Sequence, residues 1–327
     1  MIYIENTSVD PYFNLACEEY CLTTLLVTED IVMLWRDDNA IIVGSYQNTA
    51  EEINAEYVAR SQIKVARRIT GGGAVYHDLG NLNYTFILGV EELETLDMKL
   101  FAMPVVKALA KMGVTAELSG RNDITIDGRK ISGTAQHIDN KRLLYHGTLL
   151  FDSNLNILAD CLKVNIDKIE SKGIKSVKSR VTNIKDHLHE NYDVLEFKKL
   201  LIYYLFENSG FKEYKLTEED ITNINRLAKE KYSTQAWIYG ESPDCNVKNT
   251  KRFTGGTVQI HLNIKENVIE KCRIYGDFLG LISIEEVENL MRGVHYTYDN
   301  IRAALAPVNI TAYFGNITLD ELISCFI

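Results

Sequence analysis

The sequence has few of the residues and patterns that mark disulfide-rich, redox or membrane proteins. Its 327 residues include four prolines and six cysteines, and no two cysteines form a Cys-x-x-Cys pair. This argues against zinc ribbons and thioredoxin-like motifs. No apolar run approaches the roughly 18 residues of a membrane-spanning helix, and the N-terminal residues lack the basic start of a secretory signal. We therefore expect a cytoplasmic protein with reduced thiols and no membrane partner.

Positive charge is also scarce. The chain carries 35 lysines and arginines against 45 aspartates and glutamates, which gives a formal net charge of −10. Binding along a phosphate backbone requires a basic surface, so we expect no nucleic-acid partner. Small anionic ligands are not excluded, because they need only a local group of cations. With 46% hydrophobic residues the chain can bury a sizeable core, and its length fits two domains.

The order of the patterns favours an α+β class over a doubly wound sheet. Strand-like runs come early, at 31–35, 40–44 and 84–88. A mostly helical stretch then follows, from about 153 to 232. Strands followed by helices, with little regular alternation between them, are typical of α+β proteins.

Local signals place three further elements in the first half of the chain. The dipeptide Asp10-Pro11 predicts a helix start, with an N-cap followed by proline at the first helical position. Residues 100–112 predict a helix with Pro104 in its first turn or at a kink. The dipeptide Asp127-Gly128, between two short apolar runs, predicts a hairpin with a two-residue turn.

The end of the chain has a pattern of its own, which predicts a small α+β domain over residues 246–327. Turn residues near 240–249 mark the boundary, and strict alternation over 258–264 predicts a half-buried strand. Two capping-box pairs predict the starts of late helices: Ser283 with Glu286, and Thr318 with Glu321.

The most informative segment is a glycine run preceded by two arginines, Arg67 to Gly73. Three consecutive glycines let the backbone approach a ligand closely and let N–H groups point into one concavity. Arginine supplies a permanently charged fork for phosphate or carboxylate oxygens. The pattern is neither a Walker P-loop nor Gly-x-Gly-x-x-Gly. It favours an anion site over a flexible loop beside solvated arginines.

Two more segments carry groups that suit a nucleotide or acyl site. Lys130 follows the predicted hairpin turn among small residues, where its ammonium can lie against a bound ligand. Asn122 and Asp123 precede the turn and suit a nucleotide or a metal. His146 opens an apolar run, where a structural hydrogen-bonding role is the common case.

Together these segments resemble the lipoate–protein ligase A family. RRITGGGAVYHDLGN, GRNDITIDGRKISGTAQ, HGTLLF and KGIKSVKSRVTNI occur in the family's order and spacing, and WIYG and RFTGGTVQIHL resemble its accessory domain. The resemblance implies a biotin/lipoate ligase-like catalytic domain with mixed β-sheets and helices over residues 1–245. It also implies an accessory domain over residues 246–327.

The resemblance implies an ATP-dependent reaction in two steps. Lipoate and ATP give lipoyl-AMP and pyrophosphate, with Mg²⁺ as cofactor, and a lysine of a carrier protein then takes the lipoyl group as an amide. The expected carriers are lipoyl domains of dehydrogenase complexes, the glycine-cleavage H protein, or both. The preferred carrier, the choice between lipoate and octanoate and the oligomeric state are left open.

The family match also implies the site residues. Lys130 is expected to be catalytic, bridging the lipoyl carbonyl and the phosphate, and Asp123 to help hold Mg²⁺. Trp35 is expected to wall the apolar tunnel for the dithiolane tail. The expected substrate and ATP pocket comprises Trp35, Arg68, Thr70, Gly71, Gly72, Gly73, Ala74, Val75, Tyr76, His77, Asn122, Asp123, Ser132, Ala135 and His146.

Three alternatives remain beside this interpretation. An ATP-independent lipoyl or octanoyl transferase of the same fold would use Cys161, which lies downstream of His146, although a buried cysteine is the commoner case. A biotin ligase would carry a different, arginine-rich glycine loop. A silent lipoate-binding partner or regulator would not need Arg68 and Lys130. The basic segment 163–180 fits either a solvated face or a loop that closes on the adenylate or docks an acidic carrier.

Overall fold

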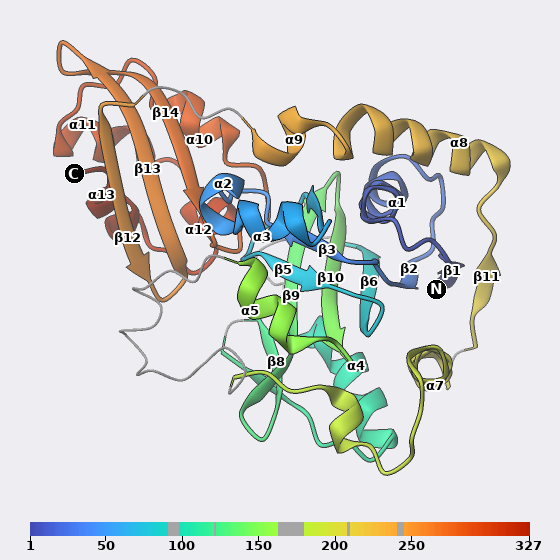
Figure 1. The fold of residues 1–327 in the computed structure, drawn as a ribbon. Coiled ribbons are helices and arrows are strands. Elements are labelled where there is room, and N and C mark those ends of the chain that lie inside the picture. The colour runs from blue at the N-terminus through green and yellow to red at the C-terminus, as the bar shows by residue number, and fades with distance from the viewer. Residues whose placement is uncertain (91–97, 121, 163–179, 208–209, 241–244) are drawn as a thin grey trace.

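The computed structural model describes six stretches of the chain, which Figure 1 shows as coloured ribbon: residues 1–90, 98–120, 122–162, 180–207, 210–240 and 245–327. The expected basic segment 163–180 lies outside the described residues except for Arg180. Within these stretches no helix is both long and apolar enough to cross a membrane.

A mixed eight-stranded sheet forms the centre of the N-terminal part. In spatial order the strands are β11 (Lys212–Tyr214), β1 (Ile2–Glu5), β2 (Ile31–Trp35), β6 (Asn81–Gly89), β10 (Arg142–Leu150), β9 (Arg129–Asp139), β8 (Asp123–Ile126) and β7 (Glu117–Ser119). Strand β1 is parallel to both of its neighbours, β11 and β2, and every other neighbouring pair is antiparallel.

Different helices cover the two faces of this sheet (Figure 1). Along β2, Val32 and Leu34 point to the face covered by α4 (Met98–Lys111) and α7 (Val194–Phe206). The alternate residues of β2 point to the face covered by α1 (Pro11–Thr23). Behind α1 lie two further helical segments, α8 (Glu218–Leu227) and the π-helical turn η3 (Ala228–Tyr232). Burial of both faces explains why β2 is apolar throughout.

A small three-stranded sheet carries the glycine-rich segment. Its order is β4 (Lys64–Arg67), β3 (Ala40–Val43) and β5 (Val75–His77), so that residues 68–74 connect its two edge strands. Short helices pack around it: α2 (Thr49–Glu52), α3 (Ala55–Arg60), α5 (Leu155–Cys161) and α9 (Gln235–Tyr239); the 3₁₀ turn η2 (Ile184–His187) lies under the large sheet instead.

The C-terminal part builds its own core around an antiparallel meander of β12 (Val247–Phe253), β13 (Gly256–Lys265) and β14 (Val268–Gly276). The alternation expected along β13 is present, since Val258, Ile260 and Leu262 are fully buried against helices. These helices are α10 (Glu285–Leu290), α11 (Tyr298–Leu305), α12 (Ile310–Phe314) and α13 (Leu319–Phe326).

Tyr46 joins this C-terminal core to the rest of the molecule. Its ring stacks on Phe278 with the centroids 4.9 Å apart, and its hydroxyl donates to the carbonyl oxygen of Ile282. The Tyr46 carbonyl oxygen in turn accepts from Gly276 N–H at 2.8 Å. The two parts therefore meet through specific contacts directly beside the glycine-rich segment.

Several local predictions are confirmed. Asp127 and Gly128 form the two-residue turn between β8 and β9 with φ of 50° and 73°, as a type I′ turn requires. A helix begins at Pro11 after Asp10, although the Asp10 carboxylate accepts from Lys64 Nζ instead of capping the helix. The helix predicted over residues 100–112 is present as α4, but Pro104 lies inside it, beyond its first turn.

One local prediction is wrong. Ser283 does not cap a helix, because α10 begins after Ile284 and the Ser283 hydroxyl accepts from Glu285 N–H at 3.3 Å. The stretch predicted to be mostly helical also contains a short strand, 212–214, which pairs with β1 as an edge strand of the large sheet. Its three residues are too few for a period to be read from the sequence.

Thr318 forms the predicted capping box with Glu321 and so supports a stability test. Thr318→Ala removes the acceptor of Glu321 N–H, and we expect the free energy of unfolding to fall by about 1 kcal/mol. Urea unfolding measures the change. Ser283→Ala is the matched control, with an expected change within about 0.5 kcal/mol. Equal losses in the two variants would contradict the assigned caps.

Candidate functional site

A cavity of about 1130 Å³ lies where three parts of the chain meet. The glycine-rich segment and β5 form one wall, and strands β6, β8, β9 and β10 of the large sheet form another. The C-terminal part supplies the third wall, including the turn between β12 and β13. Ligand sites occur preferentially where parts of a chain meet in this way.

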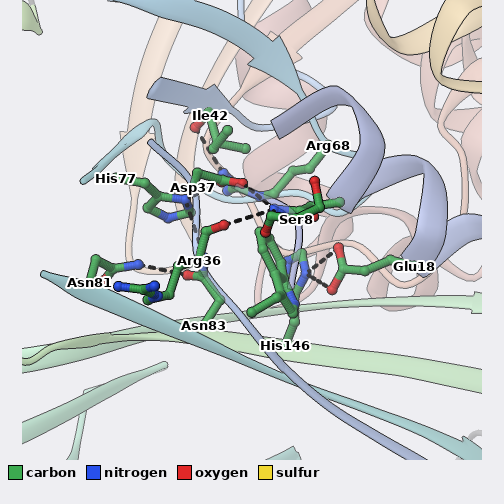
Figure 2. A network of polar contacts seen from close by, with 12 residues as sticks. Ser8, Glu18, Arg36, Asp37, Ile42, Arg68, His77, Asn81, Asn83 and His146 are labelled. Carbon is green, nitrogen blue, oxygen red and sulfur yellow. Dashed lines mark hydrogen bonds and ion pairs between the residues drawn. The ribbon is translucent and has the colours of Figure 1, made fainter. Parts of the chain in front are cut away.

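Arg68 donates hydrogen bonds to the backbone of the glycine-rich segment. Its side chain is only 6% exposed. Nη2 donates to the carbonyl oxygens of Gly71 (2.7 Å) and Gly73 (2.9 Å), and Nη1 donates to Ile42 O at 3.1 Å; Figure 2 shows the contact with Ile42. Burial lowers the pKa of Arg68 to about 10, so it stays charged at neutral pH. We expected this fork to hold a ligand; it holds the loop's carbonyl groups.

The glycines are needed because other backbone comes close on both sides. A Cβ on Gly44, at the end of β3, would lie 2.0 Å from Gly72 O, and one on Gly71 would lie 2.6 Å from Phe278 O. Gly72 itself has φ of 89° and donates its N–H to Phe278 O at 3.1 Å. The loop is therefore clamped between β3 and the C-terminal part, and one of its N–H groups is already used.

Beneath the loop, a buried chain of hydrogen bonds runs from Arg68 to Glu18 of α1. Thr70 Oγ1 accepts from Arg68 Nε at 2.9 Å and lies 2.8 Å from His146 Nε2. His146 Nδ1 lies 3.0 and 3.1 Å from the two carboxylate oxygens of Glu18, as Figure 2 shows. The chain of hydrogen bonds continues beyond Glu18, because Thr85 Oγ1 donates to the Glu18 carboxylate and accepts from Trp35 Nε1.

One direction of this hydrogen-bond chain places every proton between a donor and an acceptor. In it, Thr70 Oγ1 accepts from Arg68 Nε and donates its own proton to His146 Nε2. His146 in this arrangement carries a proton on Nδ1 and donates it to the Glu18 carboxylate. The Arg68 guanidinium and the Glu18 carboxylate then lie at the two ends of the hydrogen-bond chain, each with hydrogen-bond partners.

Lys130 stands on the wall formed by the large sheet. Its Nζ lies 2.7 Å from Asp123 Oδ1, and both side chains are partly exposed to the cavity. A Cβ on Gly133 would lie 2.7 Å from that Nζ, so a larger residue there would displace the end of the lysine side chain. The backbone of Lys130 is bonded on both sides, donating to Arg180 O (2.7 Å) and accepting from Thr182 N–H (3.0 Å). Arg180, the last residue of the basic segment, and Thr182 thus hold the Lys130 backbone in place.

His77 belongs to a second polar group on the cavity wall. Its Nδ1 lies 2.7 Å from Asp37 Oδ2, and Asn14 Nδ2 donates to the other carboxylate oxygen at 2.8 Å. Figure 2 shows His77 and Asp37 facing each other, with Asn83 nearby. These contacts join the end of β5 to the loop after β2 and to α1.

Most of the predicted pocket residues come together around the cavity. Asn122 is among them, although its amide donates to Thr134 O at 2.7 Å and so ties β8 to β9. The predicted residues that line the cavity are Trp35, Arg68, Gly72, Gly73, Ala74, Val75, His77, Asn122, Asp123, Lys130, Ala135 and His146.

Four predicted residues do not line the cavity. Thr70 and Gly71 lie under the loop surface, where Thr70 serves the buried chain. Tyr76 is buried on the opposite face of β5, where its hydroxyl donates to Asn39. Ser132 is fully buried on β9. Side chains alternate across a strand, so neighbours of lining residues face away from the cavity.

Arg67 also differs from the expectation that both arginines face an anion. Its guanidinium donates to Gly44 O, Gln47 O and Ile238 O, among other acceptors, and its Nη2 donates to Thr49 Oγ1. Burial lowers its pKa to about 10. Arg67 therefore joins loops of the fold and leaves Arg68 as the arginine on the cavity side of this pair.

Sequence reasoning missed Glu18, Asp37 and Thr85. Glu18 has a signal, since it lies at helical spacing from Leu15 and Leu22 on the buried stripe of α1. A carboxylate on an apolar stripe requires a partner. Asp37 and Thr85 carry no comparable local signal.

Cys161 does not line the cavity. Its side chain is fully buried among apolar residues near Ile41 and Ile53. Burial raises its pKa to about 12. A nucleophilic cysteine needs an accessible thiolate, so this environment does not suit one.

The direction of the buried chain predicts the tautomer of His146. We expect neutral His146 to carry its proton on Nδ1, and long-range ¹H–¹⁵N NMR spectra can assign it. Glu18→Gln places an amide donor opposite that proton, so this variant should lose about 1–3 kcal/mol of unfolding free energy. Glu29→Gln, at an exposed position, is the control. An Nε2 proton in the unaltered protein would contradict the account.

Two family models match the chain. The model described as the lipoyl protein ligase A/B catalytic domain matches residues 10–206. The model described as the bacterial lipoate protein ligase C-terminus matches residues 242–326.

Solved structures with a similar fold cover either the whole chain or its N-terminal part. LipL1 of P. falciparum, in complex with lipoate, has a TM-score of 0.79 at 24% identity and covers 99% of this chain and 98% of its own. The bipartite lipoate protein ligase of Thermoplasma acidophilum, studied with its E2 lipoyl domain, has a TM-score of 0.65 at 30% identity and covers 75% and 98%. A lipoate-protein ligase A bound with ATP has a TM-score of 0.63 at 28% identity and covers 73% and 97%.

Curated relatives match over nearly their full length. Lipoate-protein ligase LplJ of Bacillus subtilis is 45% identical over 327 residues and is covered to 99%, as is this chain. Lipoate–protein ligase 1 of Staphylococcus aureus is 43% identical over 324 residues, again with 99% of each chain covered. With the shared catalytic and C-terminal models, these matches show that the chain belongs to the lipoyl protein ligase A/B family.

Proposed function

We propose that this chain is an ATP-dependent lipoate–protein ligase, which activates lipoate as lipoyl-AMP and transfers the lipoyl group to a carrier lysine. The observation that carries the proposal is one cavity with two kinds of wall. Leu15, Trp35 and Ile42 supply an apolar wall, and Lys130 and Asp123 supply a charged one. The first suits an apolar dithiolane tail and the second suits an adenylate. The ATP-bound neighbour and the ligases among the relatives support the same function.

The first step joins two anions. A carboxylate oxygen of lipoate attacks the α-phosphorus of ATP, the bond to the β-phosphate oxygen breaks, and pyrophosphate leaves. Lys130 is the residue we propose for this junction, because its ammonium faces the cavity and can donate to the carbonyl oxygen and the phosphate together. Donors fixed where charge develops supply a large part of catalysis.

Asp123 is proposed mainly as the partner that orients Lys130, since its carboxylate already lies 2.7 Å from Nζ. Within the described residues no group of three or more metal-ligating side chains gathers. Mg²⁺ commonly binds proteins through one or two carboxylates and the substrate's phosphates. We propose that it arrives on ATP and takes at most Asp123 from the protein.

In the second step the amine nitrogen of a carrier lysine attacks the acyl carbon, AMP leaves, and the nitrogen loses its proton to give an amide. We propose lipoyl domains or a glycine-cleavage H protein as carriers. The lipoyl domain studied with a bipartite relative supports the first choice. The six free cysteines fit the cytoplasm, where we propose that the reaction occurs.

We propose that the chain consists of two functional domains with a boundary near residue 245. Residues 1–245 would bind and activate lipoate, because Lys130, Arg68 and the apolar wall lie there. Residues 246–327 would serve as the accessory domain that completes the cavity. The separate hydrophobic core of the C-terminal meander and its helices supports this division.

Lys130→Ala tests the central residue of the proposal. We expect it to lower lipoate-dependent pyrophosphate release by at least about 100-fold, because one positioned donor contributes about 3–4 kcal/mol to the transition state. Lys141→Ala, at the turn that closes the other end of β9, is the control that should keep its activity. Undiminished pyrophosphate release from folded Lys130→Ala would refute the assignment.

Cys161→Ser separates the ligase from the transferase alternative. The buried, protonated thiol has no role in the proposed reaction, so we expect unchanged lipoyl transfer in the presence of ATP. Intact-mass analysis of the carrier provides the measurement. A variant that forms lipoyl-AMP normally and yet fails to modify the carrier would favour a thioester route through Cys161.

A further inference from the structure

The turn between β12 and β13 repeats the residue types of the glycine-rich segment. Residues 252–256 are arginine, phenylalanine, threonine, glycine and glycine, and residues 68–72 are arginine, isoleucine, threonine, glycine and glycine. All five residues of the second segment line the same cavity as Arg68 and Gly72 of the first. Two Arg-x-Thr-Gly-Gly segments, one from each part of the chain, thus face one space.

The second segment is a tight turn that approaches its neighbours closely. Phe253 pairs with Gly256, which leaves Thr254 and Gly255 at the tip of the hairpin. A Cβ on Gly255 would lie 2.5 Å from the backbone oxygen of Asn316, so the tip packs directly against that segment. The position of the turn at the cavity wall is therefore set by packing.

Among the described lysines and arginines that line the cavity, Arg252 has the fewest contacts with the protein. Arg68 is buried and donates to loop carbonyl groups, and Lys130 is paired with Asp123. Arg252 is exposed, and within the described stretches its side chain makes one hydrogen bond, from Nη1 to Thr257 Oγ1 at 3.2 Å. Most of its N–H donors are left to meet a ligand.

The triphosphate of ATP carries several negative charges, and Lys130 supplies a single positive charge. ATP carries its β- and γ-phosphates away from the α-phosphate, and the pyrophosphate that leaves gains charge on the oxygen released from the α-phosphorus. A guanidinium fork matches two phosphate oxygens at once. Asp277 also lines the cavity wall formed by the C-terminal part, and its carboxylate accepts from Thr257 N–H at 2.6 Å.

We propose that the Arg252–Gly256 turn is the pyrophosphate-binding element of the site, with Arg252 contacting the β- and γ-phosphates of ATP. The inference rests on the proposed function and adds a residue from the C-terminal part to the adenylation step. Carrier modification from preformed lipoyl-AMP involves no pyrophosphate. Arg252 therefore serves the first half-reaction and not the second.

The test measures the two half-reactions separately. Arg252→Ala should lower kcat/KM for ATP in lipoate-dependent pyrophosphate release by at least about tenfold, the range for one hydrogen-bonded charge. It should raise the inhibition constant of added inorganic pyrophosphate by a similar factor. Single-turnover transfer from preformed lipoyl-AMP to the carrier should stay within about twofold of the unaltered enzyme.

Lys265→Ala is the matched control, since it removes one positive charge at the far end of the same hairpin. We expect it to leave both half-reactions unchanged. If Arg252→Ala does not fold, Arg252→Gln takes its place, because it keeps most of the side chain's length. Equal rates of pyrophosphate release in the Arg252 and Lys265 variants would overturn the inference, as would an equal loss in both half-reactions. A failure of the unaltered protein to form lipoyl-AMP would instead refute the proposed function.

Discussion

The buried chain of hydrogen bonds between Arg68 and Glu18 is the constraint on which the cavity depends. Arg68 fixes the carbonyl groups of the glycine-rich segment, and Glu18 fixes His146 and, through Thr85, Trp35. Each member is buried, so an unpaired donor or charge anywhere along it would cost free energy. These hydrogen bonds thereby fix the glycine-rich segment and Trp35 of the apolar wall in one arrangement. A site held in this way is organised before a ligand arrives.

The cations of this acidic protein have distinct tasks around the cavity. Arg67 and Arg68, adjacent in sequence, point to opposite sides, so that one joins loops of the fold and the other shapes the ligand-facing segment. Lys130 faces the cavity with its position set by Asp123, Gly133 and the backbone of residues 180–182. Burial lowers the pKa of both arginines without removing their charge at neutral pH. A chain with net charge −10 can therefore serve anions through a few placed groups.

The sequence predicts those features that depend on local chemistry. The Asp127-Gly128 turn, the capping box at Thr318 and the alternation of β13 each follow from neighbouring residues. The set of pocket residues is instead implied by the resemblance to the ligase family, and most of its members line one cavity. What the sequence does not reveal depends on contacts between distant segments. Arg67 binds the carbonyl oxygen of Ile238, 171 residues away, and Glu18 of the first helix meets His146 of β10, 128 residues away. No local pattern could have shown either partner.

The central claim is that the chain couples ATP cleavage to lipoyl transfer in one cavity. Intact-mass analysis of a purified carrier, incubated with the protein, lipoate, ATP and Mg²⁺, tests it most directly. The account predicts a gain of one lipoyl group that depends on ATP and is absent when the carrier's acceptor lysine is replaced. An unmodified carrier, or equal modification without ATP, would contradict it.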